Sequence, residues 1–152
     1  MKAKKIFLIF FLIICPLNFS FANYFDNYPD RFLCYDSSIR FKSYLDLNSV
    51  KVIRYDPPYY AIQVDRYSFD YELHAGLKTV NIYFYDYNSQ IISWQVIGMF
   101  ECDENGNLGK GGMLSKSYNA VYLKDFSPGY LAASLTFMQA YKMPFHHSSK
   151  RK

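Results

Sequence analysis

The sequence predicts an α+β domain in which an antiparallel, meander-like β-sheet is packed on one face by a single C-terminal α-helix. Segments with a period of two recur along the chain between polar or proline-containing turns, which is typical of antiparallel strands. Residues 79–102 hold the longest such pair and predict a central β-hairpin. After residue 126 the period becomes that of a helix, so that several strands are followed by one helix.

The chain begins with a segment typical of a secretory signal peptide. Three lysines in the first five residues precede an almost wholly apolar stretch over 6–16, and we expect cleavage between Ala22 and Asn23. A retained membrane anchor is the weaker alternative, because the apolar stretch is too short to cross roughly 30 Å of hydrocarbon. Lipidation at Cys15 is also weaker, because Ile14 stands where a lipobox has a small residue. The mature protein is therefore expected to be secreted or periplasmic, without a stable membrane anchor.

Removal of residues 1–22 would leave a nearly neutral chain. The precursor has 17 Lys and Arg against 13 Asp and Glu, and the loss of three lysines leaves 14 against 13. This balance argues against a nucleic-acid partner. We expect one domain over residues 23–145, which is an ordinary domain size, and a disordered basic tail over 146–152.

Four strands are predicted before the central hairpin. Their ranges are 31–35, 40–46, 50–55 and 59–64. A polar turn at 46–49 separates the second from the third, and Pro57 and Pro58 place a loop before the fourth because proline cannot donate to a ladder. Residues 65–76 are ambiguous and predict at most one further short strand.

Alternate positions of the central hairpin divide into an aliphatic set and a tyrosine set. The aliphatic set and the only tryptophan are expected to face the core: Val80, Ile82, Phe84 and Trp94. The tyrosines Tyr83, Tyr85 and Tyr87 would then form an exposed surface for protein or polysaccharide at the cell surface, because tyrosine offers a large, rigid and amphipathic contact area. The alternative is that cross-strand tyrosines only stabilise the sheet.

After the hairpin, residues 103–112 are glycine-rich and predict a flexible loop, and 117–124 predict a last strand. A helix follows over 127–141. Ser127 is a good N-cap, Pro128 suits the first helical position, and Pro144 ends the pattern. An apolar stripe on this helix is expected to pack on the sheet: Leu131, Leu135 and Met138.

The mature chain keeps two cysteines, Cys34 and Cys102. Because an exported protein meets an oxidising compartment, we expect a disulfide between them. The alternative is two free thiols, since cysteines so far apart in sequence carry no spacing signature.

The sequence contains no motif that establishes an enzyme. Residues 106–111 lack the spacing of a phosphate-binding loop, and the alternate Asp103, Asn105 and Asn107 lack the glycine and glutamate of a calcium loop. No cofactor or metal is therefore expected. We therefore expect a small exported protein that acts as a non-catalytic binding or surface-interaction module. The alternative is a small envelope hydrolase whose cleft would bring together Asp65, Asp70, His74 and Asp86.

Four features resemble small uncharacterised exported proteins of bacteria and, more distantly, the surface-adhesin protein E type of domain. They are the signal peptide, the strand Tyr44-Leu45-Asp46 followed by Ser49-Val50-Lys51, the aromatic run from Tyr83 to Tyr87, and the late helix. The adhesin resemblance implies binding of host extracellular proteins. It transfers no binding residue, because no segment matches a defined binding motif.

Overall fold

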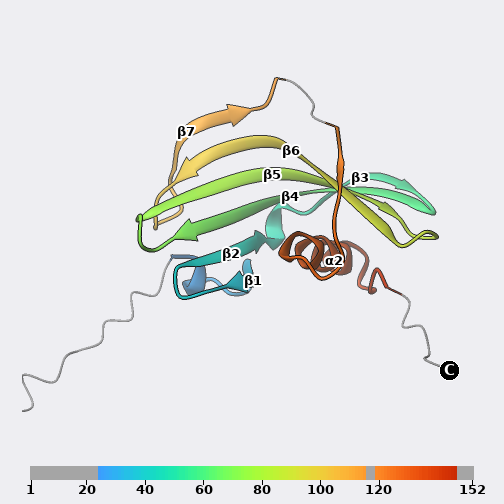
Figure 1. Cartoon of the computed structure of the whole chain (residues 1–152), viewed down its shortest axis with the longest axis horizontal. Helices are drawn as coiled ribbons and strands as arrows, with labels where there is room; N and C mark the ends of the chain where they lie inside the picture. The colour runs from blue at the N-terminus through green and yellow to red at the C-terminus, as the bar shows by residue number, and fades with distance from the viewer. Residues whose placement is uncertain (1–23, 116–118, 147–152) are drawn as a thin grey trace, which may run out of the picture.

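Three long antiparallel strands form the centre of the sheet: β4 (Tyr59–Asp70), β5 (Ala75–Asp86) and β6 (Ile91–Cys102) (Figure 1). The computed structural model describes residues 24–115 and 119–146. Short turns over 71–74 and 87–90 join the three strands, and each strand pairs with the next along nearly its whole length. The predicted central hairpin is therefore confirmed as β5 and β6.

Two short strands share each outer edge of this central unit. The short strands are β1 (Phe32–Ser37), β2 (Phe41–Asp46), β3 (Lys51–Asp56), β7 (Leu108–Met113) and β8 (Val121–Tyr122). β2 pairs with the second half of β4 and β3 with its first half, while β7 and β8 divide the edge of β6. β1 extends the sheet beyond β2. The result is an open antiparallel sheet of eight strands.

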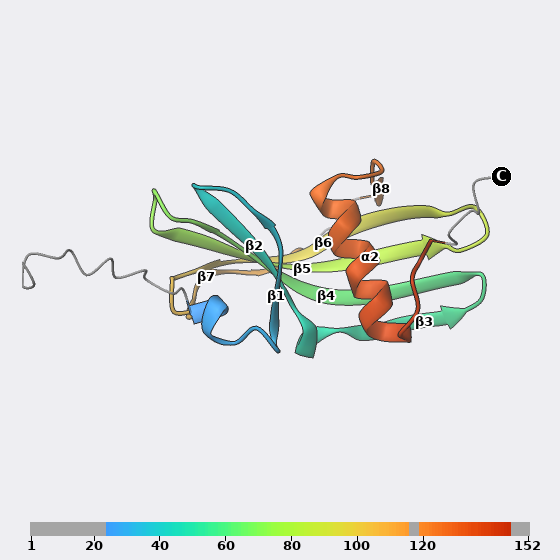
Figure 2. The ribbon, with the colours of Figure 1, turned by 90° about the horizontal axis from the view of Figure 1, so that it is seen from below.

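The helix α2 (Pro128–Tyr141) crosses one face of the sheet (Figure 2). Its N-cap is Ser127, whose hydroxyl accepts a hydrogen bond of 3.2 Å from the Tyr130 backbone nitrogen. It ends where Lys142 adopts a left-handed conformation. The predicted α+β class, with the helix at the C-terminal end, is confirmed. In the described part of the chain, no helix is long and apolar enough to cross a membrane.

The helix buries a different face from the predicted one. Leu131 and Met138 are each 45% exposed, so their predicted packing on the sheet is wrong, whereas Leu135 is partly buried and packs against the core as predicted. The buried positions are Tyr130, Ala132, Ala133, Thr136 and Phe137. Alanine lets the helix backbone approach the strands closely, and a ring such as that of Phe137 fills the remaining space.

The two faces of the central hairpin are likewise exchanged. Tyr83 and Tyr85 are buried beneath α2, whereas Ile82 and Phe84 lie partly buried on the opposite face. Trp94 is the cross-strand neighbour of Tyr83 and lies on the helix side, as predicted. The core beneath α2 is therefore built largely from tyrosine and phenylalanine rings.

A second, smaller core lies on the opposite face at one end of the sheet. The short 3-10 helix η1 (Tyr24–Asn27) covers it and inserts Phe25, which is fully buried. The ring of Phe25 stacks on that of Tyr44 at 5.1 Å and contacts that of Tyr67 at 5.0 Å. The rest of this face carries no helix among the described residues.

Several predicted boundaries change. The short strands 31–35, 40–46 and 50–55 are confirmed within one or two residues, but β4 continues through the segment left ambiguous, as far as residue 70. The loop predicted over 103–112 contains β7, and the last strand is reduced to β8. The signal peptide, the cleavage position between Ala22 and Asn23, and the tail after His146 lie outside the described residues.

Candidate functional site

The face of the sheet opposite α2 carries a hollow of about 430 Å³, which we call the outer hollow. One row of cross-strand neighbours forms its floor: Ala61, Phe84, Ser93 and Tyr122, from β4, β5, β6 and β8. Side chains two residues apart on a strand share a face. The row Tyr59, Asp86 and Ile91 therefore lies on the same face and lines the hollow as well.

Large apolar side chains at the outer hollow are exposed. The exposed fraction is 76% for Tyr122, and it is 48% for both Tyr59 and Ile53. Ile91 is 45% exposed, while Phe84 beneath them is partly buried. A contiguous group of exposed apolar side chains is typical of an interaction surface.

The charged groups at the rim of the outer hollow are already engaged within the protein. Arg54 forms an ion pair with Asp56, and its guanidinium carbon lies 5.5 Å from the centre of the Tyr59 ring. The carboxylate of Asp86 accepts hydrogen bonds of 3.0 and 3.1 Å from two backbone nitrogens of the following turn. The bond from Ser89 is the main cause that lowers the pKa of Asp86. Because these charges are compensated or locally bonded, the hollow best fits a neutral, largely apolar group.

The predicted tyrosine surface is not formed. Tyr83 is 0% exposed and Tyr85 is 2% exposed, and Tyr87 is partly buried with its ring stacked on Phe137 at 5.8 Å. Burial raises the pKa of Tyr83 to about 12. These three residues belong to the core beneath α2, so their prediction as an interaction surface is wrong.

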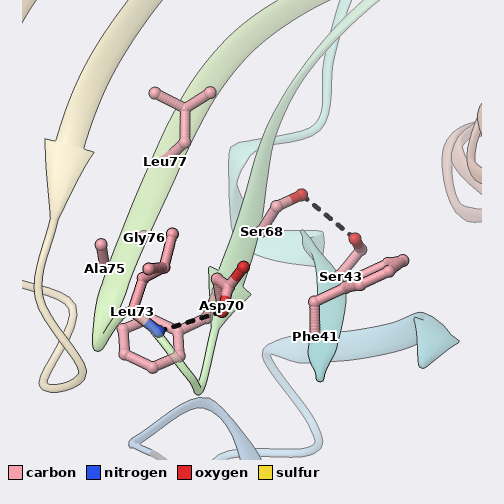
Figure 3. Close-up of a pocket in the computed structure, with 9 residues that line it drawn as sticks. Phe41, Ser43, Ser68, Asp70, Leu73, Ala75, Gly76 and Leu77 are labelled. Atoms are coloured by element: carbon pink, nitrogen blue, oxygen red, sulfur yellow. Dashed lines mark hydrogen bonds between the residues drawn. The ribbon is translucent and has the colours of Figure 1, made fainter. Parts of the chain in front are cut away.

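The four residues of the predicted hydrolase cleft do not converge. Asp70 on β4 pairs with Ala75, the first residue of β5, whereas Asp86 is the last residue of β5. Eleven residue steps of strand, or about 36 Å, therefore separate the two carboxylates. Asp70 accepts hydrogen bonds in the β4–β5 turn (Figure 3) and is paired with Arg40 at 2.9 Å.

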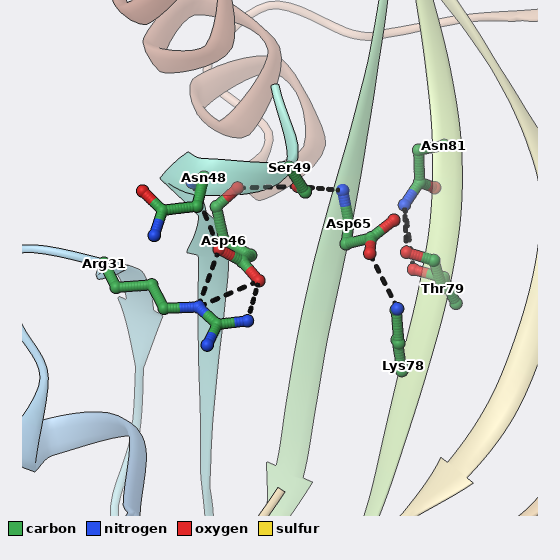
Figure 4. Close-up of polar contacts among 8 residues, drawn as sticks. All are labelled: Arg31, Asp46, Asn48, Ser49, Asp65, Lys78, Thr79 and Asn81. Carbon is green, nitrogen blue, oxygen red and sulfur yellow. Dashed lines mark hydrogen bonds and ion pairs between the residues drawn. The ribbon is translucent and has the colours of Figure 1, made fainter. Parts of the chain in front are cut away.

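The other two residues of that set have separate surroundings. Asp65 forms an ion pair of 2.7 Å with Lys78 on the face opposite α2 (Figure 4). His74 is exposed in the β4–β5 turn, where its nearest carboxylate partner is Glu104 at 4.0 Å. The candidate general acids and bases therefore share no site.

The loop compared with a calcium site is a hydrogen-bonded turn. Asp103 accepts hydrogen bonds from the backbone nitrogens of Asn105 and Asn107, and from the side-chain amide of Asn107 at 2.9 Å. Its carboxylate is thus occupied by the turn itself. Among the described residues, no group of three or more His, Cys, Asp or Glu side chains is arranged to hold a metal ion.

Cys34 and Cys102 are both free in the structure, so the predicted disulfide is wrong. Cys34 is exposed on β1, and Cys102 is buried at the end of β6. Along the sheet, β2, β4 and β5 lie between these strands, which makes four spacings of about 4.8 Å each. A disulfide requires Cα atoms about 4.4–6.8 Å apart.

Comparisons of the chain with protein-family models, with curated proteins and with solved structures find no match. The residues of the outer hollow were missed in the sequence because five strands contribute them. The alternation along the strands could have indicated them. Tyr59 and Phe84 are sequence neighbours of the buried Tyr60 and Tyr85, so their side chains point to the other face of the sheet.

Proposed function

We propose that the protein is a non-catalytic binding module and that the outer hollow receives an apolar side chain of a protein partner. The supporting observation is the exposed row of Tyr59, Ile91 and Tyr122 over the partly buried Phe84. Tyrosine and arginine are enriched among the residues that dominate binding energy at protein interfaces. The rim contributes Arg54 in addition to the tyrosines.

A polysaccharide is the second candidate partner. The aromatic rings of Tyr59, Phe84 and Tyr122 could stack on sugar rings, and the Ser93 hydroxyl could bond to a sugar hydroxyl. The exposed aliphatic side chains Ile53 and Ile91 favour a protein instead, because they offer nothing to a hydroxyl-rich ligand.

The binding test compares the parent protein with the double variant Tyr59→Ser, Tyr122→Ser. Purified protein is immobilised and presented with a panel of extracellular-matrix proteins and with a polysaccharide array. We expect one protein of the panel to bind, and the double variant to lose at least about tenfold in affinity, since a central interface side chain contributes about 1.4 kcal/mol or more.

Tyr28→Ser is the matched control, because Tyr28 is 53% exposed but lies beside η1, away from the outer hollow. It should leave the affinity unchanged. Equal binding by the parent and the double variant would exclude the outer hollow as the binding surface. Binding to the polysaccharides alone would favour the second candidate.

We also propose that the protein acts outside the cytoplasm, in the periplasm or at the cell surface. The basic start, the apolar stretch and the small residues before Asn23 support this location. Intact mass of the protein recovered from the envelope or the medium should correspond to a chain that begins at Asn23. Recovery of the uncleaved precursor from the cytosol would contradict it.

A further inference from the structure

The side of α2 that faces away from the sheet is apolar and exposed to solvent. Leu131 and Met138 lie on this side and are each 45% exposed, and the partly buried Leu135 lies between them. Residues three and four positions apart follow one side of a helix. Figure 2 looks onto this side of α2, with the strands of the sheet behind the helix. We call these three residues the outward stripe.

The helix carries no charge that would suit this side to water. None of its 14 residues is acidic or basic, and the residues next to the outward stripe include the neutral Ser134 and Gln139. A helix that is apolar all round is normally covered all round. Within the described part of the chain, the sheet covers α2 on one side only. The outward stripe is therefore expected to be a contact surface.

The spacing of the outward stripe is that of a coiled-coil seam. Leu131, Leu135 and Met138 are separated by four and then three positions, which are the d, a and d positions of a heptad. Side chains at these positions insert between the side chains of a second helix. The partner that this spacing suits is therefore another α-helix.

The exposed apolar residues are placed symmetrically about the middle of α2. A twofold axis between residues 134 and 135 would bring Leu131 level with Met138 of an antiparallel second copy. Phe126, which is 98% exposed, and Met143, which is 37% exposed, stand at the two ends of the helix. The same axis would bring them level with each other. An antiparallel pair thus matches apolar residues with apolar residues along its length.

Opposite charges stand at the two ends of α2. Asp125 lies just before the N-cap Ser127, with Lys124 one position farther away, and Lys142 follows the last helical residue. Among the described residues, neither Asp125 nor Lys142 forms an ion pair, and the Lys142 Nζ donates a hydrogen bond to the Gln139 side chain. In an antiparallel pair, each Asp125 approaches the Lys142 of the other copy, and the helix dipoles oppose. A parallel pair would bring like charges together.

Other occupants suit the outward stripe less well. After the helix the chain returns to the core, where the ring of Phe145 lies 5.3 Å from that of Tyr85. Residues 147–152 contain no apolar side chain, and residues 1–22 are expected to be removed. A membrane surface is disfavoured, because helices that lie on membranes carry lysines or arginines along their polar side. A second copy of the chain fits the spacing, the symmetry and the end charges together.

We propose that the outward stripe is a dimer interface, at which α2 pairs with α2 of a second copy in antiparallel orientation. The contact is small, so the dimer is weak and depends on concentration. The outer hollow lies on the opposite face of the sheet, so both copies keep it exposed on the outside of the dimer. Two hollows in one particle would raise the apparent affinity for a partner that is displayed in many copies.

The test is sedimentation velocity of the purified mature protein, in a reductant so that the exposed Cys34 cannot link two chains. We expect the apparent mass to rise from that of a monomer at about 5 µM toward twice that mass at about 500 µM, as for a small, weak interface. No ligand is needed, so the result does not depend on the outer hollow. A monomer over the whole range would overturn the proposal.

Charge substitutions test which residues form the interface. Leu131→Glu and Met138→Lys should each weaken dimerisation at least about tenfold, because each places an unpaired charge in the contact. The double variant Leu131→Glu, Met138→Lys should dimerise again, since the antiparallel pair brings each new carboxylate beside a new ammonium of the other copy. Leu108→Glu is the matched control: Leu108 is 49% exposed but lies on β7, so this change should leave dimerisation unaffected.

Three results would overturn the proposal, for variants verified as folded by circular dichroism. The first is parental dimerisation in both single variants, which would place the interface elsewhere. The second is a double variant that stays monomeric, which would exclude the antiparallel pairing. The third is binding to phosphatidylcholine vesicles by the parent but not by Leu131→Glu, which would make the outward stripe a membrane contact.

Discussion

The hydroxyl of Tyr85 donates a hydrogen bond of 2.8 Å to the backbone carbonyl oxygen of Ala133. Tyr85 lies on the central strand β5 and Ala133 in the middle of α2, so this bond joins the sheet to the helix across the core. It gives a buried phenol an acceptor, and a satisfied polar group can be buried at little cost. Tyrosine can therefore occupy a face where the sequence predicted aliphatic residues.

Tyr85→Phe should lower the free energy of unfolding by about 0.5–1.5 kcal/mol, because it removes one hydrogen bond and keeps the ring. Urea unfolding of the two proteins measures the difference. Tyr122→Phe is the matched control, since its hydroxyl is on a side chain that is 76% exposed, and it should have almost no effect. Equal stability of Tyr85→Phe and the parent would mean that the bond to Ala133 contributes nothing.

The buried face of α2 can be tested in the same way. Phe137 is fully buried, and its ring lies 5.0 Å from that of Tyr85 and 5.3 Å from that of Tyr60. Phe137→Ala should therefore lower the free energy of unfolding by about 3–5 kcal/mol. Leu131→Ala, at an exposed position of the same helix, should stay within about 0.5 kcal/mol of the parent. A larger loss of stability in Leu131→Ala than in Phe137→Ala would mean that the predicted leucine stripe is the face that packs on the sheet.

The sequence predicted where strands and helix lie better than it predicted which side chains are buried. Strand positions follow from a period of two, which does not depend on which face is inside. The predicted burial of the aliphatic face was wrong because both faces of the hairpin carry bulky side chains, Ile82 and Phe84 on one and Tyr83 and Tyr85 on the other, and alternation alone does not decide between them. The decisive contacts, such as the bond from Tyr85 to Ala133, join residues 48 positions apart. Such contacts cannot be read from local pattern.

The candidate sites depend on the same long-range information. The outer hollow needs the pairing of β8 with β6 and of β3 with β4. Arg66 stood in a segment that the sequence left ambiguous. No local signal indicated that its guanidinium would lie between the rings of Tyr35 and Trp94.

The two cysteines should differ in reactivity. Cys34 is exposed, so a maleimide should label it in the folded protein, whereas Cys102 should be labelled only after unfolding. The unreduced, denatured mature protein, which lacks Cys15, should give two thiols per chain. A count of zero would mean that a disulfide forms in spite of the separation along the sheet.

Cys102 also predicts a dependence of stability on pH. Burial raises its pKa from 9.0 to about 11, so the folded state holds this proton more tightly than the unfolded state. Its contribution to stability is complete below about pH 9 and declines as the pH rises toward 11. Cys102→Ala should show a smaller loss of stability than the parent over this range, measured by urea unfolding at each pH.

The junction between β2 and β3 depends on the carboxylate of Asp46, which is 3% exposed. It receives hydrogen bonds of 2.8–3.2 Å from Arg31 and one of 3.1 Å from the backbone nitrogen of Asn48, at the start of the 3-10 turn η2 (Leu47–Ser49) (Figure 4). The Ser49 hydroxyl donates to the Asp46 carbonyl and accepts from the backbone nitrogen of Asp65 on β4. The interruption that lets β2 and β3 share one edge of β4 is thus fixed by these contacts.

Arg31→Gln should therefore lower the free energy of unfolding by about 1–3 kcal/mol, because it leaves a buried carboxylate without its cation; partial exposure of Arg31 keeps the loss below that of a fully buried pair. The matched control is Arg40→Gln, which breaks exposed ion pairs with Asp70 and Glu72 and should cost less than about 1 kcal/mol. Urea unfolding measures both variants. If Arg31→Gln costs no more than Arg40→Gln, then η2 and its backbone bonds hold the junction without the ion pair, and Asp46 is stabilised by the turn alone.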